Sequence, residues 1–212
     1  MSGIWQTTCT VIHGGDETFV VDSPVLPEEL DALPSVLDQA GWELTGLLAT
    51  HGDWDHVLCR TVWPDAPLGV AETTARRLAD DPGDAVRKLR AFDEEHYVER
   101  PRPLGLGSLQ SLPVPGKLEV GDRGELELHE ATGHTVDGMA LVVPWAGVLV
   151  CGDYLSPCET PEGHTTDATG YRETLERLRP LVQAAEWVVP GHGAPISSAR
   201  AEEILDAHLA LL

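Results

Sequence analysis

The stretch from Thr50 to His56 reads T-H-G-D-W-D-H and places two imidazoles and two carboxylates within seven residues. It follows a short apolar run, which predicts a buried strand that opens into a loop at the edge of a sheet. His51 and Asp53 are two positions apart, so in an extended loop their side chains point the same way. Asp55 and His56 fall at the turn into a helix, where they are available to a second ion. These groups are common metal ligands, but a polar loop with Asp55 capping a helix gives the same pattern.

Three later motifs favour the metal-binding interpretation. They are Gly133-His134-Thr135, Gly152-Asp153-Tyr154 and Gly191-His192-Gly193. Each motif follows an apolar or alternating run and sets one His or Asp beside a glycine. A glycine at that point lets the backbone turn tightly and approach a ligand closely.

The order H-x-D-x-D-H, G-H, G-D and G-H-G resembles the metallo-β-lactamase fold superfamily, from about Val11 to the end of the chain. The usual signature is H-x-H-x-D-H, and Asp53 stands where the second His is expected. The resemblance implies an α+β fold, a four-layer αβ/βα sandwich of two mixed β-sheets with helices on the outer faces and a metal site at the sheet edges. It implies a single domain over residues 1–212.

The resemblance also implies two metal ions that share a bridging carboxylate. The implied ligands are His51, Asp53 and His134 for the first ion, Asp55, His56 and His192 for the second, and Asp153 for both. Two divalent ions about 3.5–4 Å apart lower the pKa of a bridging water, so that hydroxide is available at about pH 7, and they polarise the substrate's oxygen. Asp55 is then the catalytic residue, because it orients this hydroxide as well as binding metal.

Asp53 changes the charge of the implied site. Two divalent ions contribute +4, three aspartates −3 and a hydroxide −1, which sums to zero, whereas a His at position 53 would leave +1. An oxygen ligand also moves the preference from zinc toward iron or manganese. We therefore expect two divalent ions, with zinc as the first expectation and iron or manganese as alternatives. A weakened first site, and hence a one-metal protein, is a further alternative.

The charge of the chain bears on its partners. Fourteen Lys and Arg stand against 35 Asp and Glu, a formal net charge of −21. Such a surface repels phosphate backbones and anionic membranes, although solubility alone also accounts for it. We expect a small-molecule substrate, no nucleic-acid partner and no membrane partner. The first residues lack a basic segment followed by an apolar core, so the expected location is cytoplasmic. The oligomeric state stays open.

Several other residues are weaker candidates. Tyr154, His96 and His164 are possible substrate contacts, and each has an ordinary structural alternative. The four cysteines are too scattered for a disulfide framework, which predicts reduced thiols. Cys151 adjoins the Gly-Asp motif and is either a ligand or a small buried residue that ends a strand.

The patterning predicts the order of the elements. Expected strands cover 6–12, 18–22, 45–49, 68–70, 125–129, 139–143, 147–150 and 187–189, and expected helices cover 27–40, 84–97, 171–182 and the chain from about 198. Gly41 is expected to cap the first helix at its C-terminus. Residues 98–116 contain four prolines and are interpreted as an irregular connector or, alternatively, a lid over the pocket.

The resemblance implies an enzyme, a metallo-hydrolase of the glyoxalase II-like or lactonase-like branch that acts on a small ester, thioester or lactone. True glyoxalase II adds a basic C-terminal helical region, and here only 20 acidic-rich residues follow His192. An alternative is an iron-dependent oxidoreductase in the same cage, either diiron or similar to persulfide dioxygenase. A one-metal or non-catalytic relative is the third interpretation.

Overall fold

The first sheet begins with the hairpin that the glycine pair at residues 14 and 15 predicts. In the computed structural model, which covers residues 1–212, Gly14 faces Glu17 across the turn. The sheet has the order β1-β2-β3-β4-β5, and only β1 and β2 are antiparallel. Its strands are β1 (Thr10–Gly14), β2 (Glu17–Val21), β3 (Gly46–Leu48), β4 (Leu68–Ala71) and β5 (Leu109–Leu112). The connections contain α1 (Pro27–Ala40), η1 (Trp54–His56), η2 (Leu58–Thr61), α2 (Glu72–Asp80) and α3 (Asp84–His96).

The second sheet has the order β11-β10-β9-β8-β7-β6, and only β9 and β10 are parallel. Its strands are β6 (Gly116–Val120), β7 (Gly124–Glu130), β8 (Met139–Val143), β9 (Val148–Val150), β10 (Trp187–Val189) and β11 (Ile196–Ser197). Its other elements are η3 (Pro144–Ala146), α4 (Ala168–Ala184) and α5 (Ser198–Leu211). Both sheets are therefore mixed, as expected.

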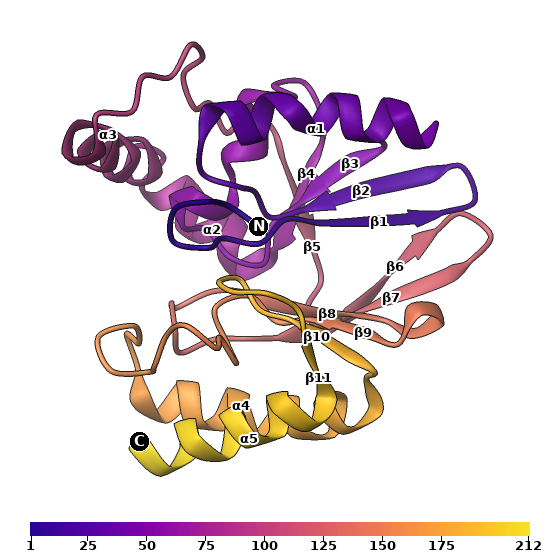
Figure 1. Cartoon of the computed structure of the whole chain (residues 1–212), viewed down its shortest axis with the longest axis vertical. Helices are drawn as coiled ribbons and strands as arrows, with labels where there is room; N and C mark the ends of the chain where they lie inside the picture. The colour runs from indigo at the N-terminus through magenta and orange to yellow at the C-terminus, as the bar shows by residue number, and fades with distance from the viewer.

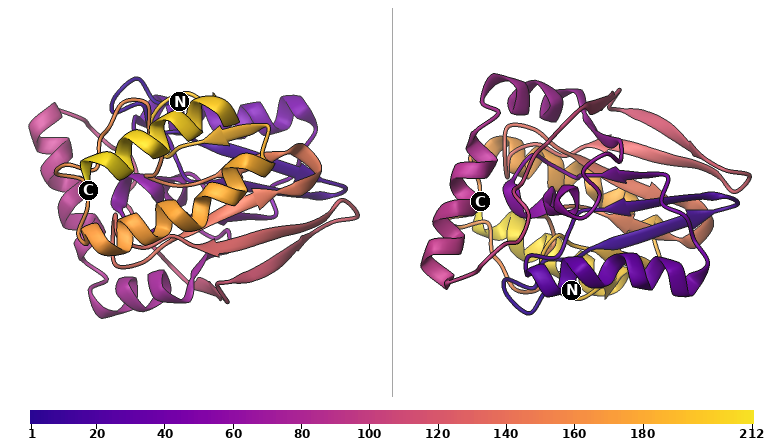
Figure 2. Two further views of the ribbon diagram at one scale, coloured as in Figure 1. Left: turned by 90° about the horizontal axis from the view of Figure 1, so that it is seen from below. Right: turned by 90° about the horizontal axis from the view of Figure 1, so that it is seen from above.

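The two sheets pack face to face with helices outside them, which makes four layers (Figure 1). Three apolar clusters fill the spaces between layers: α1 and α3 against the first sheet, the two sheets against each other, and α4 and α5 against the second sheet. Strand alternation decides which cluster each residue joins. In β2, Val20 faces the helices while Phe19 and Val21 face the other sheet. Seen from below, α4 and α5 lie side by side, and α1 covers the opposite side (Figure 2).

Most predicted elements are confirmed, including the first helix with Gly41 in a left-handed conformation at its end. The strand expected over 6–12 begins only at Thr10, because Thr7 and Thr8 pair instead with the loop at residues 191–193. The connector at 98–116 is not wholly irregular, since it contains β5 and the start of β6. Strand β5 lies at the sheet edge with mixed exposure, which hides its pattern.

Helix α2 was not predicted. Only Thr74 and Leu78 of its nine residues are buried, so its apolar repeat is too short to recognise. None of the helices has the length and apolar character needed to cross a membrane.

The topology brings four strand ends to one edge of the sandwich. Strand β8 is antiparallel to both β7 and β9, and β10 is parallel to β9, so β7, β9 and β10 run in the same direction. Their carboxyl ends lead to residues 134, 153 and 192. Strand β3 of the other sheet ends beside them, where the Met139 amide donates to the Thr50 carbonyl at 2.7 Å. The four motifs found in the sequence therefore meet at this edge.

Candidate metal centre

Three side chains from two strand ends form the first triad, which we define as His51 and Asp53 after β3 and His134 after β7. The Nε2 atoms of His51 and His134 lie 3.7 Å and 4.0 Å from Oδ2 of Asp53. One ligand atom of each residue lies within 4.8 Å of the others. Ligands that each lie about 2.0–2.2 Å from a single zinc ion are separated by comparable distances.

The second triad consists of Asp55, His56 and His192. Oδ2 of Asp55 lies 3.7 Å from Nε2 of His56 and 3.5 Å from Nε2 of His192. The loop after β3 supplies Asp55 and His56 from the 3-10 helix η1, and the loop after β10 supplies His192. Each triad therefore contains two imidazoles and one carboxylate.

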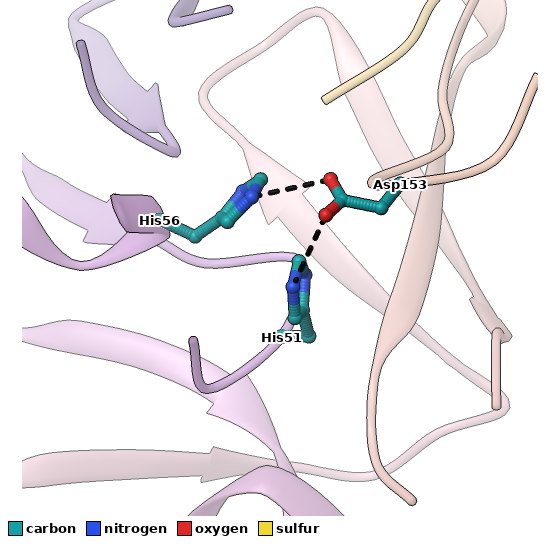
Figure 3. A group of neighbouring side chains, drawn as sticks. All are labelled: His51, His56 and Asp153. Carbon is teal, nitrogen blue, oxygen red and sulfur yellow. Dashed lines mark ion pairs between the residues drawn. The ribbon is translucent and has the colours of Figure 1, made fainter. Parts of the chain in front are cut away.

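Asp153 lies between the triads. Its Oδ1 is 3.2 Å from Nε2 of His56, and its Oδ2 is 3.1 Å from Nε2 of His134 and 3.4 Å from Nε2 of His192. Figure 3 shows the two Asp153 oxygens directed toward His51 and His56, which come from the opposite sheet. The geometry therefore places this carboxylate within reach of two ions, one in each triad.

All four histidines have a polar neighbour at Nδ1, on the side away from the centre: three make a hydrogen bond there, and His56 lies against Asp22 as an ion pair without hydrogen-bond geometry. Nδ1 of His134 contacts the carbonyl of His164 at 2.5 Å, and Nδ1 of His192 contacts the carbonyl of Trp5 at 2.8 Å. A carbonyl accepts a proton from Nδ1, which leaves the Nε2 lone pair free for a metal. Trp5 holds its carbonyl there from a left-handed backbone with φ of 54°.

Asp22 supports the other two histidines and was missed from the sequence. Its Oδ2 lies 3.1 Å from Nδ1 of His56 and accepts the Thr50 hydroxyl at 2.9 Å. That hydroxyl oxygen lies 3.2 Å from Nδ1 of His51, so it can accept the imidazole proton. Asp22 directly follows β2, the strand beside β3. The sequence signal that could have identified Asp22 is its position at the end of a buried apolar strand.

The donor set fits a metal. Nε2 of His51, Nε2 of His56 and Oδ1 of Asp153 are buried and have no hydrogen-bond partner within the protein. A buried polar atom without a partner is costly, and here three such atoms point toward a common centre. Divalent cations bound by imidazole and carboxylate would satisfy all three.

Close packing requires glycine beside the candidate ligands. A Cβ on Gly191 would clash with Oδ1 of Asp153 and approach Cε1 of His56 to 2.9 Å. A Cβ on Gly133, which has φ of +114°, would clash with the backbone of Tyr171. These contacts explain why the motifs carry glycine.

Protons balance the charges when no cation is bound. Burial and the neighbouring His56 lower the pKa of His51 to about 4. Burial would also lower the pKa of His192, but contact with Asp153 outweighs it and raises that pKa to about 9. Burial would raise the pKa of Asp53, but His51 and the guanidinium of Arg77 hold it at about 2. The cluster therefore holds the Asp53 and Asp153 carboxylates ionised and draws positive charge.

A cavity of about 360 Å³ opens onto both triads. Its walls are Asp53, Asp55, His134, Asp153 and His192 together with Trp5, Trp54, Glu159 and His164. This volume is in the range of sites for small molecules. No residue between 98 and 116 lines the cavity, so the lid interpretation gains no support.

The weaker candidates occupy different places. His164 lines the cavity, whereas His96 is exposed and its ring packs at a tilt against Phe92, with ring centroids 4.4 Å apart. The Tyr154 hydroxyl is turned away from the cavity and donates to the carbonyl of Thr132. Cys151 is buried, and burial raises the pKa of its thiol. It therefore matches the alternative of a small buried residue at the end of a strand.

Comparison with known proteins identifies the family. The family model of the metallo-beta-lactamase superfamily matches residues 2–192, and the chain belongs to this superfamily. The chain is similar to a metallo-beta-lactamase family protein from Thermus thermophilus, with 23% identity, a TM-score of 0.72 and coverage of 96% of this chain and 75% of that one. An archaeal superfamily protein from Sulfolobus tokodaii has 22% identity, a TM-score of 0.70 and coverage of 95% and 80%.

A third solved structure is the protein TTHA1623 in a di-iron-bound form. It has 18% identity to this chain, a TM-score of 0.71 and coverage of 95% of both chains. At these identities the solved structures establish the fold, and they confirm the predicted arrangement of two mixed sheets with helices outside.

Proposed function

We propose that the protein is a metal-dependent hydrolase of a small, uncharged ester, thioester or lactone. The observation that carries this proposal is the convergence of buried, unpartnered His51 Nε2, His56 Nε2 and Asp153 Oδ1 beside a cavity that is lined by Asp153 and four further candidate ligands. Membership of the metallo-beta-lactamase superfamily supports it. The first triad would hold one divalent ion, the second triad another, and Asp153 would contact both. When bound, such a pair of ions supplies an activated water and polarises the substrate's oxygen.

The protein's own groups have distinct tasks in this proposal. The four imidazoles are fixed through Nδ1 and present Nε2 inward, so they bind without reorganising. Asp55 lines the cavity, and burial raises the pKa of its carboxyl group. Asp55 would therefore orient the attacking water as well as bind metal.

The cavity wall indicates the substrate class. None of its lining residues is a Lys or Arg, so nothing in the wall would bind a carboxylate or phosphate of the substrate. Trp5 and Trp54 form an apolar wall, with ring centroids 5.4 Å apart. These features favour an uncharged acyl group over the anionic substrates that a basic pocket would select.

A second candidate function has one specific observation in its favour. Each triad consists of two imidazoles and one carboxylate, the ligand set typical of non-haem iron. One protein of similar fold has been solved in a di-iron-bound form. An iron-dependent oxidoreductase in the same site is therefore the alternative to test.

The test starts with elemental analysis of protein purified without added metal. The protein is then stripped, reloaded separately with zinc, iron(II) or manganese(II), and assayed on uncharged aryl esters, thioesters and lactones and for oxygen uptake with a persulfide. We expect hydrolysis that is lost in Asp55→Asn and kept in Asp65→Asn, an exposed control. Oxygen uptake without hydrolysis would favour the second candidate, and a protein that binds none of these ions would contradict both.

A further inference from the structure

Arg77 pairs with a candidate metal ligand and belongs to no motif. It lies on α2, where Nη2 contacts Oδ1 of Asp53 at 2.5 Å and Nη1 contacts Oδ1 of Asp137 at 2.6 Å. The ion pair between Arg77 and Asp53 is the only one in the structure that joins a Lys or Arg to a candidate ligand. Asp53 is the residue that stands in place of the second histidine of the usual signature, so this ion pair requires an explanation.

The two oxygens of Asp53 face in opposite directions. Oδ1 contacts the guanidinium, while Oδ2 faces the Nε2 atoms of His51 and His134. Arg77 therefore fixes the rotation of the carboxylate and leaves one oxygen for an ion. A charge-assisted bond of this kind is stronger than one between neutral groups.

The guanidinium is itself held rigidly. Asp137 is buried, accepts Arg77 on one oxygen and accepts the Gly52 amide on the other at 2.9 Å. Gly52 separates His51 from Asp53 in the chain, so one network positions both the backbone and the carboxylate of the first triad. Groups that orient metal ligands in this way typically change metal affinity about 10–100-fold when removed.

Arg77 also offsets part of the negative charge at position 53. Two divalent ions and three aspartates sum to +1, whereas an imidazole at position 53 would leave +2. The guanidinium of Arg77 adds one positive charge beside Asp53, whose carboxylate makes the site one unit less positive than an imidazole would. Asp137 contributes one negative charge on the other side of the guanidinium, so Arg77 offsets the charge of Asp53 only in part.

We propose that Arg77 is a positioning residue that makes Asp53 a metal ligand, and that the two residues form a unit replacing the second histidine of the usual signature. This inference rests on the proposed function only in requiring that metal binds, and the reaction does not enter it. It predicts that Asp53 and Arg77 are coupled, so that changing one alters the effect of changing the other.

The test measures metal stoichiometry and affinity, by elemental analysis and by competition with a chromophoric chelator, and uses zinc and manganese(II) as probes. Arg77→Gln removes the charge and keeps a donor for Asp137. We expect it to lower first-triad affinity about 10–100-fold, toward one ion per chain, while Arg76→Gln, an exposed control on the same helix, keeps two. Unchanged affinity in Arg77→Gln would overturn the proposal.

A double-variant cycle supplies the second measurement. Asp53→His alone places an imidazole against the guanidinium, so we expect weak binding at the first triad. Asp53→His with Arg77→Gln should regain tight zinc binding, at least tenfold above Asp53→His. Equal affinities for the single and double variants would overturn the coupling. If Arg77→Gln does not fold, Arg77→Met, which also removes the charge, replaces it in both measurements. A parent protein that binds no metal would instead contradict the proposed function.

Discussion

The two triads contain the same groups, two imidazoles and one carboxylate, but they differ in burial and in neighbours. Side chains of the second triad, Asp55, His56 and His192, are 8%, 0% and 5% exposed. In the first triad, Asp53 and His134 are 25% and 13% exposed, while His51 is 5% exposed. Only the first triad includes a carboxylate paired with an arginine.

This difference indicates that the candidate metal centre has two unlike halves. The second triad is the half that tolerates less change of ligand, and the first triad is the half that tolerates more. The side chains of the second triad are at most 8% exposed, although Asp55 and His192 also line the cavity. In the first triad, Asp53 is more exposed and lies beside α2, which supplies an external charge through Arg77. A change of ligand is therefore tolerated at position 53, provided that its charge is balanced nearby.

Replacing Asp153 should have the largest effect, because its carboxylate lies between the two triads and would serve both. In Asp153→Ala we expect metal content to fall from two ions per chain toward zero, with loss of activity. Elemental analysis should show a smaller loss for His134→Ala or His192→Ala, each of which removes one ligand from one triad. Near-normal metal content in the Asp153 variant would rule out a shared ligand.

Metal removal should empty the two triads one after the other. A ligand at 100–1,000 times its Kd stabilises the fold by about 2.7–4.1 kcal/mol, so stripping should lower Tm by roughly 5–15 °C. Under graded chelation, the exposed first triad should lose its ion before the buried second triad. Calorimetry with metal analysis at each step measures both. A constant Tm after verified metal loss, or release from the second triad first, would break the comparison.

Asp22→Asn should weaken both halves together, because Asp22 contacts His56 directly and His51 through Thr50. The expected loss of metal affinity is about 10–100-fold at each triad. Chelator competition measures it, and Asp31→Asn, at an exposed position of α1, is the control. An effect on one triad alone would show that Thr50 does not transmit the contact to His51.

The pH dependence of metal binding should give the smallest effect. In the metal-free protein His192 has a pKa of about 9, raised from 6.5 by Asp153 against the effect of burial. Its proton stabilises the metal-free fold fully below pH 6.5, and this contribution is lost as pH rises through 9. Metal must displace that proton, so affinity should rise with pH and level off above the His192 pKa. Calorimetric titrations in two buffers of different ionisation enthalpy would count the protons released near neutral pH.

The candidate ligands were predictable from the sequence because chemistry and backbone requirements coincide at most of them. His134, Asp153 and His192 stand beside glycines that the packing requires, each after a strand. The strands run in one direction, so their ends meet. The single domain over residues 1–212 and the choice of metal stay predictions.

The groups around the ligands could not be predicted in the same way. Arg77 lies in a helix whose buried face is too short for a pattern, and its partners Asp53 and Asp137 are remote in sequence. Trp5 contributes its carbonyl oxygen, and any residue type has one. Only Asp22, a carboxylate at the end of a buried strand, left a signal that could have been used.

The spread of the ligands along the chain has a consequence for synthesis. His56 leaves the ribosome 136 residues before His192, a delay on the order of ten seconds at about 5–20 residues per second. During that delay the first sheet has neither Asp153 nor the Trp5 contact with His192, so neither triad is complete. Which ion occupies the centre is therefore decided by the finished fold and by the ions around it after release, and not by the nascent T-H-G-D-W-D-H loop.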